Sequence, residues 1–176
     1  MISVQTSHTA DLEPGTLSAA RALLYDVFDD MSEHDWEHSL GGVHAIAWDG
    51  DALIGHAAVV QRRLLHGGRA LRCGYVEGVG VHAGHRRAGH GAAMIEALER
   101  VVRRAYDLGA LAATDEAVAL YAGRGWKRWD GPSSALTPDG IRRTPDDDGG
   151  IYVLPGELAL DLSGELTCDW RDGDEW

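Results

Sequence analysis

The segment between residues 43 and 81 constrains the fold most, because it contains successive strand-like runs separated by turn sequences. The runs are VHAIAW (43–48), ALIGHAAVVQRRLL (52–65) and ALRCGYVEGVGV (70–81). The intervening turns are DGD (49–51) and HGG (66–68). Asp-Gly and Gly-Gly pairs favour short connections between antiparallel strands. The sequence therefore predicts three adjacent antiparallel strands in the first half of the chain.

Helical periodicity appears on both sides of this region. Apolar residues recur at spacings of three and four after Pro14 and again between Ala92 and Ala105, which predicts two amphipathic helices. Ser32 followed by Asp35 has the spacing of a helix-starting cap, so a short helix is expected there, before Gly41 and Gly42. In the later long helix, a set of charged residues is expected to face outward, and a glycine to end the helix: Glu96, Glu99, Arg100, Arg103 and Gly109.

The remaining segments predict a mixture of short strands, helix and turns. The expected strands are residues 3–9, LGALAAT (108–114), IYVLP (151–155) and ELALDL (157–162). DEAVALYAGRG (115–125) is expected to be helical, and residues 129–150 are rich in turn-forming Pro, Asp and Gly. Strands first, followed by helix, strand and helix, indicate an α+β domain.

Composition narrows the classes of function. The 176 residues suit one domain, expected to span residues 1–176, and the formal charge of −12 argues against nucleic acid as a partner. The first residues lack the basic and apolar regions of a signal peptide, and no apolar run is long enough for a membrane span. Cys73 and Cys168 lack metal-site spacing, which favours reduced thiols in a cytoplasmic protein without a membrane partner.

The third strand-like run is interrupted by Gly74, Gly78 and Gly80. Glycine inside a strand often marks a bulge or a close approach of another backbone. A strand that is merely weak has the same pattern. Spacing alone leaves both interpretations open.

The run that follows, HRRAGHG (85–91), combines arginines and glycines at the expected start of a helix. Unpaired amides at a helix N-terminus attract anions, small residues allow close approach, and arginine forms bidentate bonds with phosphate. The run lacks the spacing of a Walker A loop and of a GxGxxG fingerprint. By itself it predicts no more than an anion site, and a plain basic loop is the simpler alternative.

A metal-dependent hydrolase is a competing interpretation of another motif. His34, Glu37 and His38 form an H-x-x-E-H pattern, and histidines four residues apart can share a metal on one helix face. The match is short, and no clear third ligand follows. We therefore expect no metal site.

Longer stretches of the sequence resemble a known family. Arg86-x-x-Gly89-x-Gly91, directly after the glycine-rich strand, is similar to the pyrophosphate loop of the GNAT superfamily of acetyl-CoA-dependent N-acetyltransferases. The similarity to aminoglycoside 2′-N-acetyltransferases extends from about Asp11 to Trp176. It is carried by DWEHSLGGVHA, QRRLL, ALRCGYVEGV, LYAGRGW, RTPDDDG and CDWRDGDEW.

The resemblance implies a fold and a way of binding the acetyl donor. The implied fold is the GNAT fold, a mixed, mostly antiparallel central sheet with a bulged strand, flanked by helices. The bulged strand would pair with the pantetheine arm of coenzyme A, and the basic loop would hold its pyrophosphate. The implied cofactor-binding residues are Val79, Gly80, Val81, Arg86, Arg87, Ala88, Gly89, His90 and Gly91.

The resemblance also implies catalytic roles. Glu77 would remove a proton from the acceptor ammonium group, through a water, because only a neutral amine attacks a thioester. The C-terminal carboxylate of Trp176 is the alternative base, and which of the two dominates stays open. Tyr121 would donate a proton to the leaving thiolate, and the Val79 N–H would polarise the thioester carbonyl.

Carboxylates suit an acceptor that carries several ammonium groups. The resemblance implies a cationic aminoglycoside partner and a homodimer. The implied substrate-binding residues are Asp30, Asp35, Glu77, Gly78, Asp147, Asp174 and Trp176. A GNAT enzyme for another small amine, or a protein that binds cationic sugars without acetylating them, stays open as an alternative.

Overall fold

The computed structural model describes residues 2–176, which divide into two compact units. The first unit contains the residues up to Val60 together with Val76–Val101. The second contains Gln61–Tyr75 together with Val102–Trp176. The boundaries between the units fall within two strands and one helix, so each of these elements contributes to both units.

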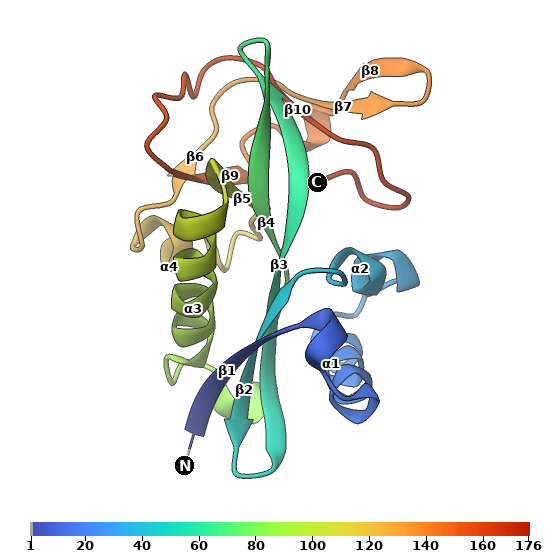
Figure 1. Ribbon diagram of the computed structural model, residues 1–176, viewed down its shortest axis with the longest axis vertical. Coiled ribbons are helices and arrows are strands. Elements are labelled where there is room, and N and C mark those ends of the chain that lie inside the picture. Colours follow the sequence, from blue (N-terminus) through green and yellow to red (C-terminus); the bar gives the residue numbers. More distant parts are fainter. Residues whose placement is uncertain (1) are drawn as a thin grey trace. The chain divides into compact units, whose positions relative to one another are not determined.

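The first unit is built on antiparallel pairs of strands (Figure 1). Strand β1 pairs with β2, and β2 pairs with the first part of β3, with Ile46 opposite His56. The elements with residues in this unit are β1 (Ile2–His8), α1 (Pro14–Val27), α2 (Glu33–His38), β2 (Val43–Asp49), β3 (Ala52–His66), β4 (Arg69–Val81) and α3 (His90–Ala105). Single 3-10 turns lie at Thr9–Asp11 and Ala83–His85.

Helices pack on opposite faces of this part of the sheet. A Cβ placed on Gly55 would lie 3.0 Å from Met94 of α3, whereas the next residue, His56, has its ring 6.0 Å from the Trp36 ring of α2. Successive residues of a strand point to opposite faces. Helix α3 therefore covers one face and α2 the other.

The residues that the sequence predicts at the starts of helices α1 and α2 occupy those positions. Helix α1 begins at Pro14, which occupies the first turn, where a missing N–H costs nothing. At α2, the Ser32 side chain accepts from the Asp35 N–H, while the Asp35 carboxylate accepts from the Ser32 N–H, so the capping box is complete. Both helices contribute to one apolar cluster, in which Ala20, Leu23, Leu24 and Trp36 are buried.

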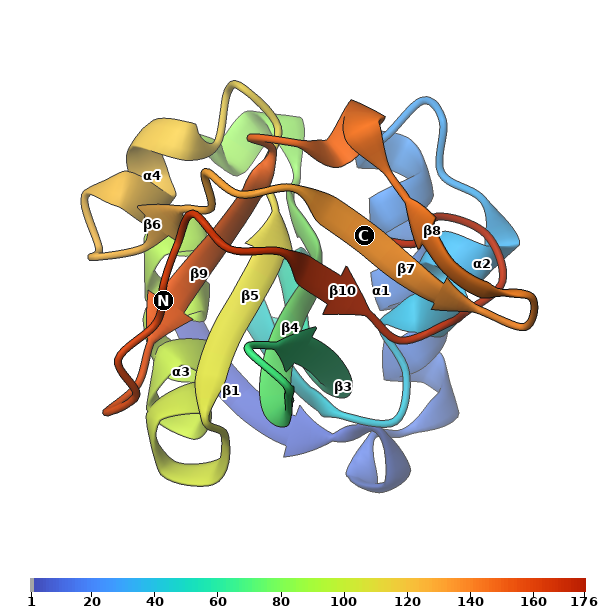
Figure 2. The ribbon, with the colours of Figure 1, turned by 90° about the horizontal axis from the view of Figure 1, so that it is seen from above.

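The second unit contains a mixed sheet in the order β6-β9-β5-β4-β3-β10-β7-β8. The pairs β6–β9, β5–β9, β3–β10 and β7–β8 are antiparallel, whereas β4 with β5 and β10 with β7 are parallel. Figure 2 shows β9 beside β5 and the β7–β8 hairpin. The elements that complete this unit are β5 (Leu108–Ala112), α4 (Val118–Ala122), β6 (Lys127–Arg128), β7 (Ser133–Thr137), β8 (Gly140–Arg143), a 3-10 turn (Pro145–Asp147), β9 (Ile151–Pro155) and β10 (Leu166–Cys168).

The α+β class with a mixed sheet and flanking helices is confirmed. Two expectations for α3 were wrong. Glu99 is buried, because it lies four residues after Ile95 and three before Val102, on their apolar face. Gly109 does not end the helix, which stops at Ala105; it lies within β5.

The C-terminal third also departs from expectation. Residues 157–162 form no strand, although their apolar residues alternate. The Leu162 carbonyl instead accepts from Asp130 and Gly131 N–H groups, while β10 pairs with β3 and β7. The expected turn region 129–150 contains the β7–β8 hairpin. Alternation alone did not predict which segment would find a strand to pair with.

Candidate active site

The predicted site residues occur in both units. In the first unit, Glu77, Gly78, Val79 and Val81 are half-buried near the end of β4. Gly78 has φ +55°, in the left-handed region, so the regular strand geometry breaks at this residue. A Cβ at Gly78 would lie 2.7 Å from Ser39 Oγ and 3.1 Å from Leu24 Cδ1. The regular strand geometry therefore breaks at Gly78, and Ser39 and Leu24 close the space around this residue.

This crowding makes Gly78→Ala a stability test. We expect it to lower the free energy of unfolding by about 1–3 kcal/mol, because alanine at positive φ is strained and its Cβ meets Ser39. Gly50→Ala is the matched control, since Gly50 has φ +58° but nothing within 4 Å of an added Cβ. The free energy of unfolding of both variants, measured in urea, separates the backbone strain that they share from the Ser39 contact that only Gly78→Ala makes. Equal losses would show that the Ser39 contact contributes nothing.

The basic loop lies between β4 and the N-terminus of α3. Residues 86–89 are exposed, and α3 begins at His90. Arg87 has φ +59° and Gly89 has φ +86°, so two loop residues adopt the left-handed conformation before the helix starts. The Arg86 Nε–H donates to the Val81 carbonyl at 3.1 Å, which holds the guanidinium beside the strand end. Exposed amides and two guanidinium groups fit a pyrophosphate.

The acidic residues predicted near the start of the chain differ from each other. Asp35 Oδ2 accepts from the Ser32 N–H at 2.8 Å and from the Ser32 hydroxyl at 2.7 Å, so this oxygen caps α2. Asp30 is exposed in the turn between α1 and α2. Asp35 therefore has a structural task in addition to the predicted binding role.

In the second unit, the tail brings three of the predicted acceptor residues together. Burial of Asp147, followed by the nearby Asp174 carboxylate, raises the pKa of Asp147. The Trp176 side chain is buried, and its Nε1–H donates to Thr144 Oγ1 at 2.9 Å, in the turn that precedes Asp147. The carboxylates of Asp147 and Asp174 repel each other, and a bound polycation would relieve that repulsion.

The C-terminal tail is also fastened to the sheet, by contacts that the sequence did not predict. The Arg62 side chain is only 4% exposed; its Nε donates to Asp169 Oδ1 at 2.8 Å, and its terminal nitrogen donates to the Asp169 carbonyl at 2.9 Å. The guanidinium of Arg62 also lies 4.7 Å from the centroid of the Tyr75 ring. Adjacent arginines in QRRLL are the only signal in the sequence, and they do not reveal a partner 107 residues away.

Comparison with known proteins identifies the family. A model of the acetyltransferase (GNAT) domain matches residues 10–129, more than half of the chain. The chain belongs to the GNAT acetyltransferases. A curated aminoglycoside 2′-N-acetyltransferase from Mycolicibacterium fortuitum is 52% identical over 174 residues, covering 96% of this chain and 89% of the relative.

Solved structures support the GNAT fold. Eis1 from Mycobacterium abscessus superposes with a TM-score of 0.62 at 18% identity, over 76% of this chain and 32% of that chain. This chain thus spans about a third of the length of that relative. The ribosomal-protein-S18-alanine N-acetyltransferase from Escherichia coli gives a TM-score of 0.59 at 21% identity, covering 92% and 97% of the two chains. Likeness at this level of identity shows the fold alone.

Tyr121 of this GNAT chain lies in α4 and is 4% exposed. Its ring contacts the Trp126 ring edge-on, with centroids 5.8 Å apart. Burial raises the pKa of Tyr121 to about 12. The phenol therefore keeps its proton at neutral pH, and full transfer to a thiolate whose conjugate acid has a pKa near ~8.5 is uphill. Such a phenol stabilises a thiolate best by donating a hydrogen bond.

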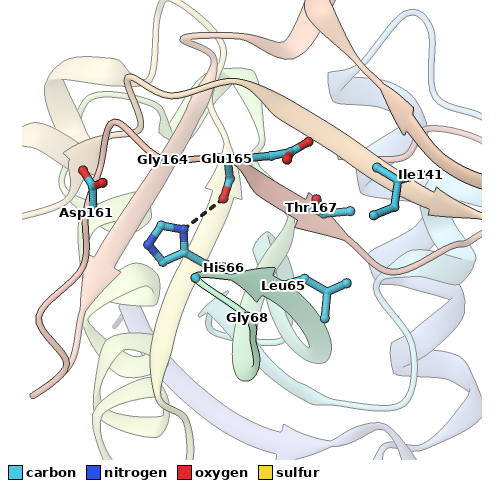
Figure 3. Close-up of a pocket in the computed structure, with 9 residues that line it drawn as sticks. Leu65, His66, Gly68, Ile141, Asp161, Gly164, Glu165 and Thr167 are labelled. Carbon is cyan, nitrogen blue, oxygen red and sulfur yellow. Dashed lines mark hydrogen bonds between the residues drawn. The ribbon is translucent and has the colours of Figure 1, made fainter.

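A separate cavity of about 370 Å³ in the second unit contains none of the predicted site residues. His66 donates through Nδ1 to the Glu165 carbonyl at 2.9 Å on one side of it (Figure 3). The lining residues are Leu65, His66, Gly67, Gly68, Ile141, Asp161, Gly164, Glu165 and Thr167. We assign this cavity no part in acetyl transfer.

The H-x-x-E-H motif forms most of α2. His34 Nδ1 lies 3.5 Å from Glu37 Oε2, an exposed pair on the helix surface. Within residues 2–176, no group of three or more His, Cys, Asp or Glu side chains is arranged to hold a metal ion. Over the same residues, no helix combines the length and apolar character needed to cross a bilayer.

Proposed function

We propose that this chain transfers the acetyl group of acetyl-CoA to the 2′-amine of aminoglycosides, and thereby confers resistance to them. The observation that carries the proposal is the 52% identity to an aminoglycoside 2′-N-acetyltransferase over 96% of the chain. The clustered carboxylates of Asp147 and Asp174 support it, because they suit an acceptor with several ammonium groups.

In this proposal, acetyl-CoA supplies the activated acyl group, and the loop from Arg86 to Gly91 binds its pyrophosphate. The exposed amides before α3 and the guanidinium held at Val81 support that role. The backbone of Val79, Gly80 and Val81 binds the pantetheine arm. The Val79 N–H donates to the thioester oxygen and stabilises the charge that develops on it.

Glu77 accepts, through a water, the proton that the acceptor ammonium group must lose. The neutral nitrogen then forms the new N–C bond, the C–S bond breaks, and coenzyme A leaves as its thiolate. Tyr121 donates a hydrogen bond to that sulfur. The nitrogen loses its second proton as the amide forms, and this proton ultimately neutralises the thiolate, while Glu77 returns the first proton to solvent. Asp30, Asp35, Gly78, Asp147, Asp174 and the Trp176 carboxylate bind the acceptor, and the last is the alternative base.

We further propose that residues 1–176 form a single acetyltransferase domain that works as a cytoplasmic homodimer. The coverage of the curated relative supports the single domain. Cys73 and Cys168 are buried free thiols, which suits a reducing compartment. The dimer follows from the family resemblance alone, and sedimentation equilibrium tests it directly.

A pair of closely related antibiotics tests the acceptor position. Kanamycin B carries an amine at the 2′ position, where kanamycin A carries a hydroxyl. We expect thiol release with kanamycin B and an at least ~100-fold lower rate with kanamycin A, because the hydroxyl is the weaker nucleophile and leaves the site's polar groups mismatched. NMR of the product locates the new amide. Equal turnover of both antibiotics contradicts the 2′ assignment, and no turnover of any aminoglycoside contradicts the proposed substrate class.

A further inference from the structure

A buried network of hydrogen bonds in the first unit ends at Gly78 of β4. Thr9 Oγ1 lies 2.7 Å from His44 Nε2, His44 Nδ1 lies 2.8 Å from His56 Nε2, and His56 Nδ1 lies 2.8 Å from the Gly78 carbonyl oxygen. Both histidines are completely buried. Burial lowers the pKa of each imidazole to about 4, so both rings are neutral at neutral pH.

The Gly78 carbonyl, at the end of this network, sets the donor and acceptor of each hydrogen bond in it. Gly78 O can only accept, so the single proton of neutral His56 lies on Nδ1. His56 Nε2 must then accept, which places the proton of His44 on its own Nδ1. His44 Nε2 in turn accepts from the Thr9 hydroxyl at 2.7 Å, which is closer than the Gly42 carbonyl at 3.3 Å, and the Thr9 oxygen accepts from the Gly41 N–H at 2.9 Å.

This hydrogen-bond network does not conduct protons to the reaction. Its last acceptor is an amide carbonyl, which is not a base at neutral pH. Two buried imidazoles with fixed tautomers instead hold one peptide group in one orientation. Leu24 and Ser39 lie close around the same residue, and its φ of +55° marks the break in the regular strand geometry.

The peptide group held in this way includes a predicted catalytic donor. The Gly78 C=O and the Val79 N–H belong to one planar unit, and the described residues contain no cis peptide bond. In a planar trans peptide these two bonds point in opposite directions. Fixing the carbonyl on His56 therefore fixes the direction of the Val79 N–H, and a hydrogen bond at the carbonyl also polarises the amide.

We infer that Thr9, His44 and His56 form a positioning device that orients the Val79 N–H toward the oxygen of the reacting thioester. This inference rests on the proposed function, in which that N–H stabilises the developing negative charge. His56 acts through the Gly78 carbonyl and does not touch the substrates. The device makes the oxyanion donor rigid before the acetyl donor binds.

Kinetics of two His56 variants test this role. His56→Leu removes the donor, and we expect kcat to fall about 10-fold with little change in either KM, because the Val79 N–H is misdirected but still present. His56→Asn keeps an N–H near the position of Nδ1 and is expected to recover most of the rate. His66→Leu is the matched control: His66 also donates through Nδ1 to a backbone carbonyl, that of Glu165, and its loss should leave kcat unchanged.

The wild-type protein provides a second test that no folding defect can obscure. Nitrogen-15 NMR of the imidazoles should show His44 and His56 both as neutral Nδ1–H tautomers. An Nε2–H tautomer at His56 overturns the inference, as does unchanged kcat in His56→Leu when the wild type is active. A wild type that releases no thiol from acetyl-CoA with any amine overturns the proposed function, and this role falls with it.

Discussion

Replacing Glu77 with glutamine is expected to reduce kcat at neutral pH by about 100-fold. Glutamine has nearly the same shape but accepts no proton, so the acceptor must enter as the scarce free amine or lose its proton to water. General base catalysis contributes rate enhancements of this order. Thiol release from acetyl-CoA, followed from pH 5 to 9, measures the effect. The loss should shrink as pH rises, because the free amine becomes more abundant.

The control for this substitution is Glu96→Gln, the same change at an exposed carboxylate of α3 that pairs with Arg100. It should leave the pH profile unchanged, since an exposed pair of this kind contributes little even to stability. Wild-type kinetics in Glu77→Gln at every pH would remove Glu77 as the base. The Trp176 carboxylate would then become the principal candidate.

Deleting Trp176 is expected to raise the KM for the aminoglycoside by 10-fold or more. The deletion moves the terminal carboxylate by one residue and removes the buried indole that donates to Thr144 at 2.9 Å. A charge-assisted hydrogen bond to an ammonium group is worth about 1.5–3 kcal/mol, which corresponds to about 10-fold or more in affinity. The KM for acetyl-CoA should change little, and initial-rate kinetics with each substrate varied separate the two effects.

Trp176→Phe separates the carboxylate from the indole. This variant keeps the terminal carboxylate and most of the buried apolar volume but loses the hydrogen bond to Thr144. We expect a smaller rise in the acceptor KM than with the deletion. If the deletion and the wild type bind the acceptor equally well, neither Trp176 nor its carboxylate takes part in acceptor recognition.

The proposed division of charge explains how an acidic chain binds an anionic donor. The formal charge is −12, yet Arg86 and Arg87 lie together beside the helix N-terminus of α3. The carboxylates of Asp147, in the turn Pro145–Asp147, and of Asp174, in the C-terminal tail, lie close to each other in the second unit. Local concentration of charge governs ligand binding more than net charge does, because ions screen interactions beyond about 10 Å.

Local signals in the sequence predicted most of the elements around the site. The DGD and HGG turns, the Ser32–Asp35 cap and the Pro14 helix start all act between residues a few positions apart. Such signals work because turns, caps and helical faces depend on near neighbours. Glu99 shows where residue type and spacing conflict: its charge predicts exposure, but its spacing from Ile95 and Val102 places it on the apolar face, where it is buried.

By itself, the sequence determined the α+β class, the glycine-interrupted strand, the basic loop and the family to which they belong. Only the tertiary structure decided what confines Gly78, where the tail is fastened, and which way the protons point along Thr9, His44 and His56. These features join residues that lie between 12 and 107 positions apart in the sequence. Their hydrogen bonds and burial exist only after folding has brought distant segments together, so no local pattern encodes them.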